Sequence, residues 1–228
     1  MLGVLTTSIR EKSMNAYDSL IFDLDGTLWS TVQICTSAWN DVLRSEKRKE
    51  ITVADMGSTM GLTAEEIRKK FFADLNKDEG ERLLARCFDH EVSLLKKDGG
   101  ILYPFVAEGI KELSQHFQLF VVSNCEVPYM DVFLATSGLK GYFKGWECHG
   151  ATRLSKGDNT LEIMRRNIIS RPIFVGDTHG DQAAALHAEI PFAFVAYGFG
   201  VCTQYDFKFD SFHHLTTTFL NMVSKKRD

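Results

Sequence analysis

The amino-acid sequence predicts an α/β fold in which a parallel sheet is covered by helices on both faces. After residue 100, short apolar runs alternate with stretches of helical texture, and several of the runs are followed at once by polar residues. Strands that are buried on both faces read as continuous apolar runs, and their alternation with helices is typical of a parallel sheet. We therefore expect a Rossmann-like core.

The first strand is expected at Ser19–Phe22, where Gly26 follows and permits a tight loop. A long helical segment then separates this strand from the second. Within it, Thr63–Glu66 fits a capping box that opens a helix, and another helix is expected over Asp78–Lys97, ending at Gly99.

The remaining elements alternate. We expect helices at 105–117, 127–137, 158–168, 181–188 and 211–222, and strands at 119–122, 172–175 and 192–196.

This pattern divides the chain into a core and an insertion. The α/β core takes residues 15–30 and 100–228, and a small helical cap, residues 31–99, is inserted after the first strand. Residues 1–14 are expected to be a disordered extension, with Met14 as a candidate downstream start.

The composition narrows the class of protein. A formal net charge of −4 provides no basic field for nucleic acid. Five scattered cysteines without a CxxC pair are typical of reduced thiols in a cytoplasmic protein. No apolar run approaches the roughly 20 residues needed to span a bilayer. We expect a cytoplasmic protein, monomeric or weakly dimeric, that binds neither nucleic acid nor membrane.

Carboxylates follow the first strand. Side chains two apart on an extended chain share a side, so Asp23 and Asp25 can face one site. Gly26 lets the backbone turn and brings amides, including that of Thr27, near an anion. Ligands in open α/β sheets bind at the carboxyl ends of the strands, which makes this loop a candidate site.

Further polar residues follow the later strands. Ser123 and Asn124 offer a hydroxyl and a free amide, Lys156 is placed in a loop before a helix, and Asp177 and Asp181 lie one helical turn apart. Each has an ordinary alternative as a turn, surface or capping residue. The case depends on their occurring together, in consistent order, at strand ends.

The predicted cluster has an electrostatic problem. Asp23, Asp25, Asp177 and Asp181 would crowd like charges into one crevice and force some to protonate. A hard divalent cation together with Lys156 would remove this conflict, and a set of oxygen ligands favours Mg²⁺. Mg²⁺ retains waters and binds through a few carboxylates together with substrate phosphate.

These residues resemble the motifs of a known superfamily. Phe22–Leu28 with the sequence FDLDGTL, Val122–Asn124, Lys156 and Val175–Asp181 with the sequence VGDTHGD resemble the four motifs of the haloacid dehalogenase superfamily. The match spans nearly the whole chain. A helical insertion between the first and second motifs resembles the C1-capped branch, which includes phosphoglycolate phosphatases and β-phosphoglucomutase.

The resemblance implies a role for each residue. Asp23 would be the nucleophile and a metal ligand, and Asp25 the general acid and base, with its carbonyl on Mg²⁺. Ser123, the Asn124 amide and the region of Gly26 and Thr27 would hold the phosphoryl group. Lys156 would neutralise charge. Asp177 would bind Mg²⁺ directly, and Asp181 directly or through water.

The sequence departs from the family at two places. Trp29–Thr31 stands where relatives often have an acidic residue, and Gly157 follows Lys156 where many have proline. The first departure concerns substrate contacts near the cap. Within the cap, the glycine-containing loop Met56–Gly61 could approach a ligand or simply connect helices, and the basic run Arg68–Lys70 could meet an anion or face solvent.

The leading hypothesis is therefore a Mg²⁺-dependent phosphatase that hydrolyses a small phosphomonoester through an aspartyl-phosphate. Intramolecular sugar phosphomutase activity on the same fold is the nearest alternative. A non-catalytic binding module is a third, and the intact set of motif residues argues against it.

Overall fold

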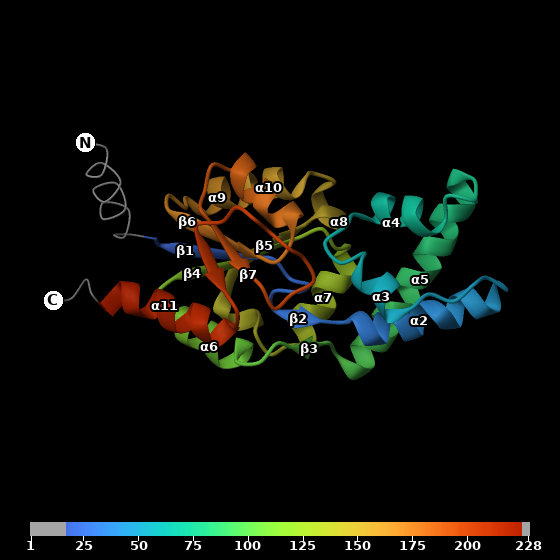
Figure 1. Cartoon of the computed structure of the whole chain (residues 1–228), viewed down its shortest axis with the longest axis horizontal. Coiled ribbons are helices and arrows are strands. Elements are labelled where there is room, and N and C mark those ends of the chain that lie inside the picture. The colour runs from blue at the N-terminus through green and yellow to red at the C-terminus, as the bar shows by residue number, and fades with distance from the viewer. Residues whose placement is uncertain (1–16, 225–228) are drawn as a thin grey trace.

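The computed structural model describes residues 17–224, and residues 1–14, expected to be disordered, lie outside this range. A six-stranded parallel sheet forms the centre of the molecule (Figure 1). Across the sheet the strands run β5 (Phe143–Cys148), β4 (Gln118–Ser123), β1 (Ser19–Phe22), β6 (Pro172–Gly176), β7 (Phe192–Val195) and β8 (Phe207–Phe209).

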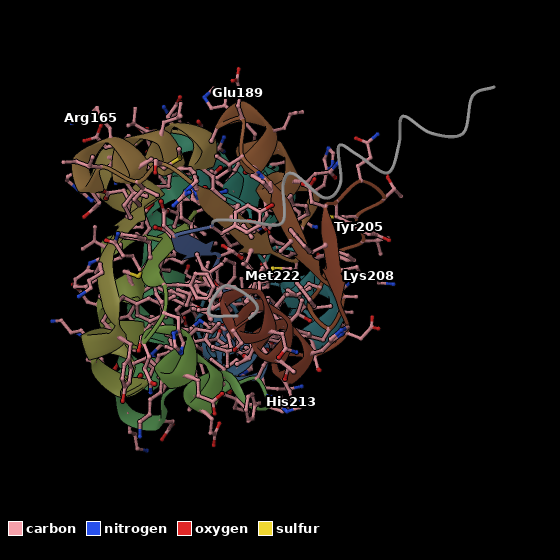
Figure 2. All side chains as sticks on the ribbon, turned by 90° about the vertical axis from the view of Figure 1, so that its left-hand side faces the viewer. Arg165, Glu189, Tyr205, Lys208, His213 and Met222 are labelled. Carbon is pink, nitrogen blue, oxygen red and sulfur yellow. The ribbon has the colours of Figure 1, made fainter. Side chains whose placement is uncertain are left out.

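Helices cover both faces of this sheet. After the insertion, the chain forms α6 (Val106–Leu113), α7 (Val127–Thr136), the 3-10 turn η1 (Lys140–Tyr142), α8 (His149–Thr152), α9 (Lys156–Asn167), α10 (His179–His187) and α11 (Phe212–Ser224). Figure 2 shows Arg165 of α9 and His213 of α11 on opposite sides of the molecule. The sequence-based expectation of a doubly covered parallel sheet is confirmed.

Alternate residues of each central strand point into separate cores. Leu20 and Phe22 of β1 lie in the core formed with α6, α7 and α11. Ile21 lies in the core formed with α9 and α10, together with Phe174 of β6. All four side chains are 0% exposed. Because successive strand residues face opposite sides, a strand covered on both faces has no position for a polar residue, which explains its continuous apolar run.

The insertion consists of helices α2 (Val32–Ser45), α3 (Val53–Gly57), α4 (Ala64–Phe71) and α5 (Lys77–Asp98). Figure 1 shows them together at the end of the sheet away from α11. Thr63 and Glu66 form the expected capping box at the start of α4. Helix α5 ends at Gly99, whose φ of 71° is a left-handed conformation that glycine adopts readily.

Two short strands lie side by side where the insertion leaves the core and returns to it. β2 (Trp29–Ser30) pairs antiparallel with β3 (Ile101–Leu102), with Trp29 opposite Leu102. A Cβ on Gly100 would collide with the Trp29 ring, so only glycine allows this close approach. The two connections of the insertion therefore form one paired ribbon.

Some elements differ from the sequence-based expectation. The expected start of a helix at Asp158 is wrong, because Ser155 accepts from the Asp158 amide and α9 begins at Lys156. Lys156 therefore lies in the first helical turn, not in a preceding loop. Part of the expected loop Met56–Gly61 belongs to α3, which Thr52 caps.

Strands β5 and β8 were not expected from the sequence. Both are edge strands. β5 carries exposed or half-buried residues at Lys144, Gly145 and Trp146, so its sequence lacks the continuous apolar run of a central strand. Within residues 17–224, no helix is both long and apolar enough to cross a bilayer.

The packing of α6 on α11 leads to a prediction. A Cβ on Gly109 of α6 would collide with Thr216 and Phe212 of α11. We expect Gly109→Ala to lower the free energy of unfolding by about 1–3 kcal/mol, the usual cost of overpacking. Urea unfolding measures this. Gly141→Ala is the control, because a Cβ there meets nothing within 4 Å, and equal losses in both variants would contradict the prediction.

Candidate active site

The carboxyl ends of the central strands bring the first predicted site residues together. Phe22 of β1 lies level with Val121 of β4 and Val175 of β6, so the residues that follow these three strands meet at one edge. The Asp23 amide donates to the Val175 carbonyl at 2.8 Å. The Asp23 side chain, 1% exposed, is thereby fixed beside the loop that carries Asp177.

Lys156 links two of the carboxylates. Its Nζ lies 2.6 Å from Asp23 Oδ1 and 2.6 Å from Asp181 Oδ1, and the side chain is buried. Burial alone would lower the Lys156 pKa, but the Asp181 and Asp23 carboxylates outweigh it and raise this pKa above its ordinary value. Lys156 is therefore a permanent cation.

Asp181 is held by the loop that precedes α10. Its Oδ2 accepts from the Asp177 amide at 3.1 Å, the Thr178 amide at 2.9 Å and the Thr178 hydroxyl at 2.7 Å. Thr178 in turn caps α10, completing a capping box. With Oδ1 bonded to Lys156 and Oδ2 to three donors, Asp181 is better placed to meet a cation through water than directly, of the two roles that the sequence left open.

Asp177 lies in a tight backbone cradle. Its Oδ2 accepts from the Phe199 amide at 2.6 Å, and the Thr27 hydroxyl lies 3.5 Å from its Oδ1. A Cβ on Gly26 or on Gly198 would collide with the Asp177 carboxyl group. Gly26 also has φ 88°, the left-handed region that favours glycine. Both glycines are therefore required for Asp177 to reach this place.

The cluster is suited to a hard cation. Asp23, Asp177 and Asp181 each offer an oxygen, and these atoms lie within 4.8 Å of one another. Asp23 Oδ2 is buried without a hydrogen-bond partner. Burial first, and the Asp181 charge second, raise the pKa of Asp23 well above its ordinary value and that of Asp177 to about 7. A bound cation would satisfy the orphan oxygen and offset this repulsion.

Asp25 faces a hydrogen-bond donor that the sequence did not reveal. The Tyr129 hydroxyl donates to Asp25 Oδ1 at 2.5 Å, and the Thr31 hydroxyl lies 2.7 Å from the same Tyr129 oxygen. Burial raises the pKa of Asp25 to about 6, while the bond from Tyr129 opposes that rise. A carboxyl group that titrates near neutrality suits both proton donation and proton acceptance. Tyr129 lies 104 residues away on α7, so no local pattern indicates it.

Ser123 and Asn124 follow β4 as expected. The Ser123 hydroxyl accepts from the Cys125 amide at 3.2 Å. Asn124 Nδ2 donates to the Gly61 carbonyl of the insertion at 2.8 Å, whereas its Oδ1 is buried without a partner. Asn124 therefore connects the end of β4 directly to the segment that the sequence singled out for its glycines.

A cavity of about 100 Å³ lies between the insertion and the strand ends. Asp23, Asp25, Ser123 and Asn124 line it from the core side. Gly26, Thr27, Lys156, Asp177 and Asp181 do not line it, because they pack around Asp23 and Asp177 instead. Met56 and the segment Thr59–Leu62 line it from the insertion, so this part of the chain does more than connect helices.

The basic run of α4 lies elsewhere. Arg68 and Lys69 pair with Glu65, and Lys70 donates to the Ser58 carbonyl. None of the three lines the cavity. The run is a surface feature of α4.

Glu91 is a second buried carboxyl group on the cavity wall, and sequence reasoning missed it. It lies on α5, is 7% exposed, and its Oε2 accepts from Trp39 Nε1 at 2.6 Å. Burial raises the pKa of Glu91 to about 8. An acidic residue in a helix that is polar along most of its length gives no signal in sequence.

Comparison with known proteins identifies the class. Residues 20–195 match the profile of the haloacid dehalogenase-like hydrolase family. The chain belongs to this family, and the helical insertion between its first and second motifs is that of the C1-capped branch, as the resemblance implied.

Particular relatives are phosphatases. A phosphoglycolate phosphatase of Agrobacterium fabrum is 28% identical over an alignment of 220 residues, and the match covers 90% of this chain and 94% of that protein. One from Rhodobacter capsulatus is 25% identical and covers 79% of this chain and 85% of its own. The crystal structure of a predicted phosphatase from Clostridium acetobutylicum has the same fold, with a TM-score of 0.76 at 20% identity over 91% of this chain and all of the other. Family and relatives support a phosphoric monoester hydrolase.

The raised pKa of Glu91 predicts a pH dependence of stability. Its folded pKa of about 8 exceeds the ordinary 4.5, so the folded protein holds this proton more tightly than the unfolded chain. The contribution of protonated Glu91 to the free energy of unfolding is therefore fully present below pH 4.5 and is lost as the pH rises through 8. Relative to Glu91→Gln, the wild type should lose on the order of a few kcal/mol between pH 5 and 9. Urea unfolding at several pH values measures this difference, and a constant difference would contradict the prediction.

Proposed function

We propose that the protein is a Mg²⁺-dependent phosphatase that hydrolyses a small phosphomonoester through an aspartyl-phosphate on Asp23. The observation that carries the proposal is the buried Lys156 beside Asp23, at 2.6 Å, within a carboxylate cluster suited to a cation. An anionic nucleophile can approach an anionic phosphate only where such charges offset the repulsion. The phosphatases among the relatives support the same reaction.

The metal site follows from the donors. Asp23 and Asp177 would hold Mg²⁺ through carboxylate oxygens, with the backbone carbonyl of Asp25 as a further ligand and Asp181 in support. When bound, the ion would neutralise charge on the phosphate and on Asp23 during transfer. Mg²⁺ prefers oxygen ligands and retains waters, which suits a site with few protein carboxylates.

The residues divide the first chemical step between them. An Asp23 oxygen attacks phosphorus, and the bond from phosphorus to the leaving oxygen breaks. Asp25 gives its proton to that oxygen, so the alcohol leaves neutral. The Ser123 hydroxyl, the Asn124 amide and the backbone at Gly26 and Thr27 hold the phosphoryl oxygens, while Lys156 keeps Asp23 oriented through their 2.6 Å contact.

The second step reverses the proton transfer. Asp25, now a carboxylate, takes a proton from water, the water oxygen attacks phosphorus, and the bond to Asp23 breaks. Inorganic phosphate and free Asp23 result. The hydrogen bond from Tyr129 keeps Asp25 in one orientation through both steps. A fixed orientation is needed because the same carboxyl group acts first as the acid and then as the base.

Removing the nucleophile or the acid should abolish turnover. We expect Asp23→Asn and Asp25→Asn each to lower kcat for phosphate release by at least about a thousandfold, the usual scale for losing a covalent or proton-transfer group. A screen over phosphoglycolate, sugar phosphates and an aryl phosphate with Mg²⁺ measures this. Asp131→Asn, an exposed aspartate on α7, is the matched control. Full activity in Asp23→Asn would exclude the mechanism.

Cation binding should also be visible without turnover. At pH 8, Mg²⁺ at 100 times its dissociation constant should stabilise the wild type by about 2.7 kcal/mol, seen as a raised Tm that chelation reverses. Asp177→Asn should lose this increase in Tm. Without metal, the Tm of Asp177→Asn should equal or exceed that of the wild type, because one repelling charge is gone. A wild-type Tm indifferent to Mg²⁺ would refute the assigned metal site.

A further inference from the structure

The lining of the cavity above Asp23 has an unusual charge for a site that receives an anion. Its acidic residues are Asp89, Glu91 and Glu126, besides Asp23 and Asp25. Among the described residues that line it, there is no lysine, arginine or histidine. Lys156, the nearest buried cation to the nucleophile, is already shared between Asp23 and Asp181. Glu126 is paired with Arg153, which does not line the cavity. The part of the substrate that is not phosphate therefore meets carboxyl groups, apolar groups and neutral polar groups such as Thr59.

This lining disfavours a leaving group that carries a carboxylate. A buried carboxylate needs a cation or several hydrogen-bond donors, because the free energy of desolvation otherwise exceeds the free energy gained from its contacts. Among the described residues that line the cavity, none offers it that cation. The named substrate of the phosphoglycolate phosphatase relatives thus fits this cavity poorly.

Glu91 has the features of a recognition group. Its Oε2 is fixed by Trp39, whose ring is packed against Phe71, Phe72 and Phe88. The other hydrogen-bond partner of this carboxyl group is the Cys35 thiol, a weak donor that also lines the cavity. Trp39 therefore orients the carboxyl group, and its remaining lone pairs can accept from a stronger donor that arrives in the cavity.

Aromatic groups complete this end of the cavity. Trp39, Phe88 and Tyr129 line it beside Glu91. Aromatic faces attract an ammonium group within about 6 Å, more strongly where water is excluded. A carboxylate ringed by aromatic side chains is suited to an amine, whereas a neutral polyol would leave donors and acceptors unpaired against the apolar wall.

The volume limits the size of the ligand. The cavity of roughly 100 Å³ is smaller than one of about 150 Å³ that holds benzene, so it favours a short ligand. Phosphate esters of amino alcohols with two or three carbon atoms are among the shortest that carry an ammonium group.

We propose that the substrate is the phosphate ester of a short amino alcohol, with its ammonium at Glu91 and its phosphoryl group at Asp23. This inference rests on the proposed phosphatase function and specifies its substrate class. The reaction is unchanged: water replaces the amino alcohol on phosphorus, and the leaving oxygen takes the proton of Asp25.

Three substrates of similar size test the proposal through turnover. They are O-phosphoethanolamine, 2-hydroxyethyl phosphate, whose alcohol part is uncharged, and phosphoglycolate. We expect wild-type kcat/KM for O-phosphoethanolamine to exceed that for 2-hydroxyethyl phosphate at least tenfold, with phosphoglycolate lowest. In Glu91→Gln the ratio of the first two should fall to about one. Because both rates come from one protein, partial misfolding cancels in the ratio. Glu79→Gln, an exposed glutamate on the same helix, should keep the wild-type ratio.

A binding measurement separates this proposal from the catalytic one. With Mg²⁺, 2-aminoethylphosphonate should raise the wild-type Tm more than phosphonoacetate does, and Glu91→Gln should remove the difference. Neither compound has an ester to hydrolyse. One outcome separates the two proposals. If acetyl phosphate and all three esters resist hydrolysis while 2-aminoethylphosphonate still raises the Tm more than phosphonoacetate does, the proposed phosphatase function is wrong and the amine-binding site is supported. Equal or better use of phosphoglycolate, or an amine preference that survives in Glu91→Gln, would overturn the substrate proposal.

Discussion

The site depends on one buried cation placed between two carboxylates. Lys156 Nζ lies 2.6 Å from Asp23 Oδ1 and 2.6 Å from Asp181 Oδ1, in a buried place where an unpaired charge would be costly. Removing any member of such an arrangement leaves an uncompensated charge in the interior. The parallel sheet makes the arrangement possible, because β1 and β6 end level with each other, and α9 begins at the same edge with Lys156 in its first turn. The residues proposed as nucleophile, counter-charge and metal ligands are thus positioned by backbone register.

The same constraint explains the glycines around Asp177. Its carboxyl group lies against Gly26 and Gly198, and neither position has room for a Cβ. Backbone therefore packs against the Asp177 carboxyl group on both of these sides. The cavity on the other side of Asp23 takes much of its lining from side chains of the insertion, including Glu91. The groups proposed for catalysis and the group proposed for recognition are thus carried by separate parts of the chain, so the specificity for a ligand could change while the residues at the strand ends stay the same.

The sequence predicted the residues that local patterns mark, and it did not predict those that folding brings together from distant parts of the chain. Asp23, Asp25 and Asp177 follow continuous apolar runs, so their placement at strand ends could be predicted from pattern alone. Lys156 was found from its motif position, but its helical start was misplaced, because Ser155 and Asp158 are both plausible caps. Tyr129 and Glu91 could not be found. Their partners Asp25 and Trp39 lie 104 and 52 residues away, and both sit in helices whose composition is ordinary. The edge strand β5 was missed because its exposed residues break the apolar run.

The paired strands β2 and β3 have a consequence for movement. Both connections of the insertion pass through one ribbon, and Trp29 of that ribbon also bridges back to Asp25. Because the two strands are paired, both connections of the insertion can move only together. The hydrogen bond from Asn124 to the Gly61 carbonyl joins the core to the insertion at a second place. A movement of the insertion relative to the core would therefore bend this ribbon and break the bond between Asn124 and Gly61, while Asp25 stays bridged to Trp29.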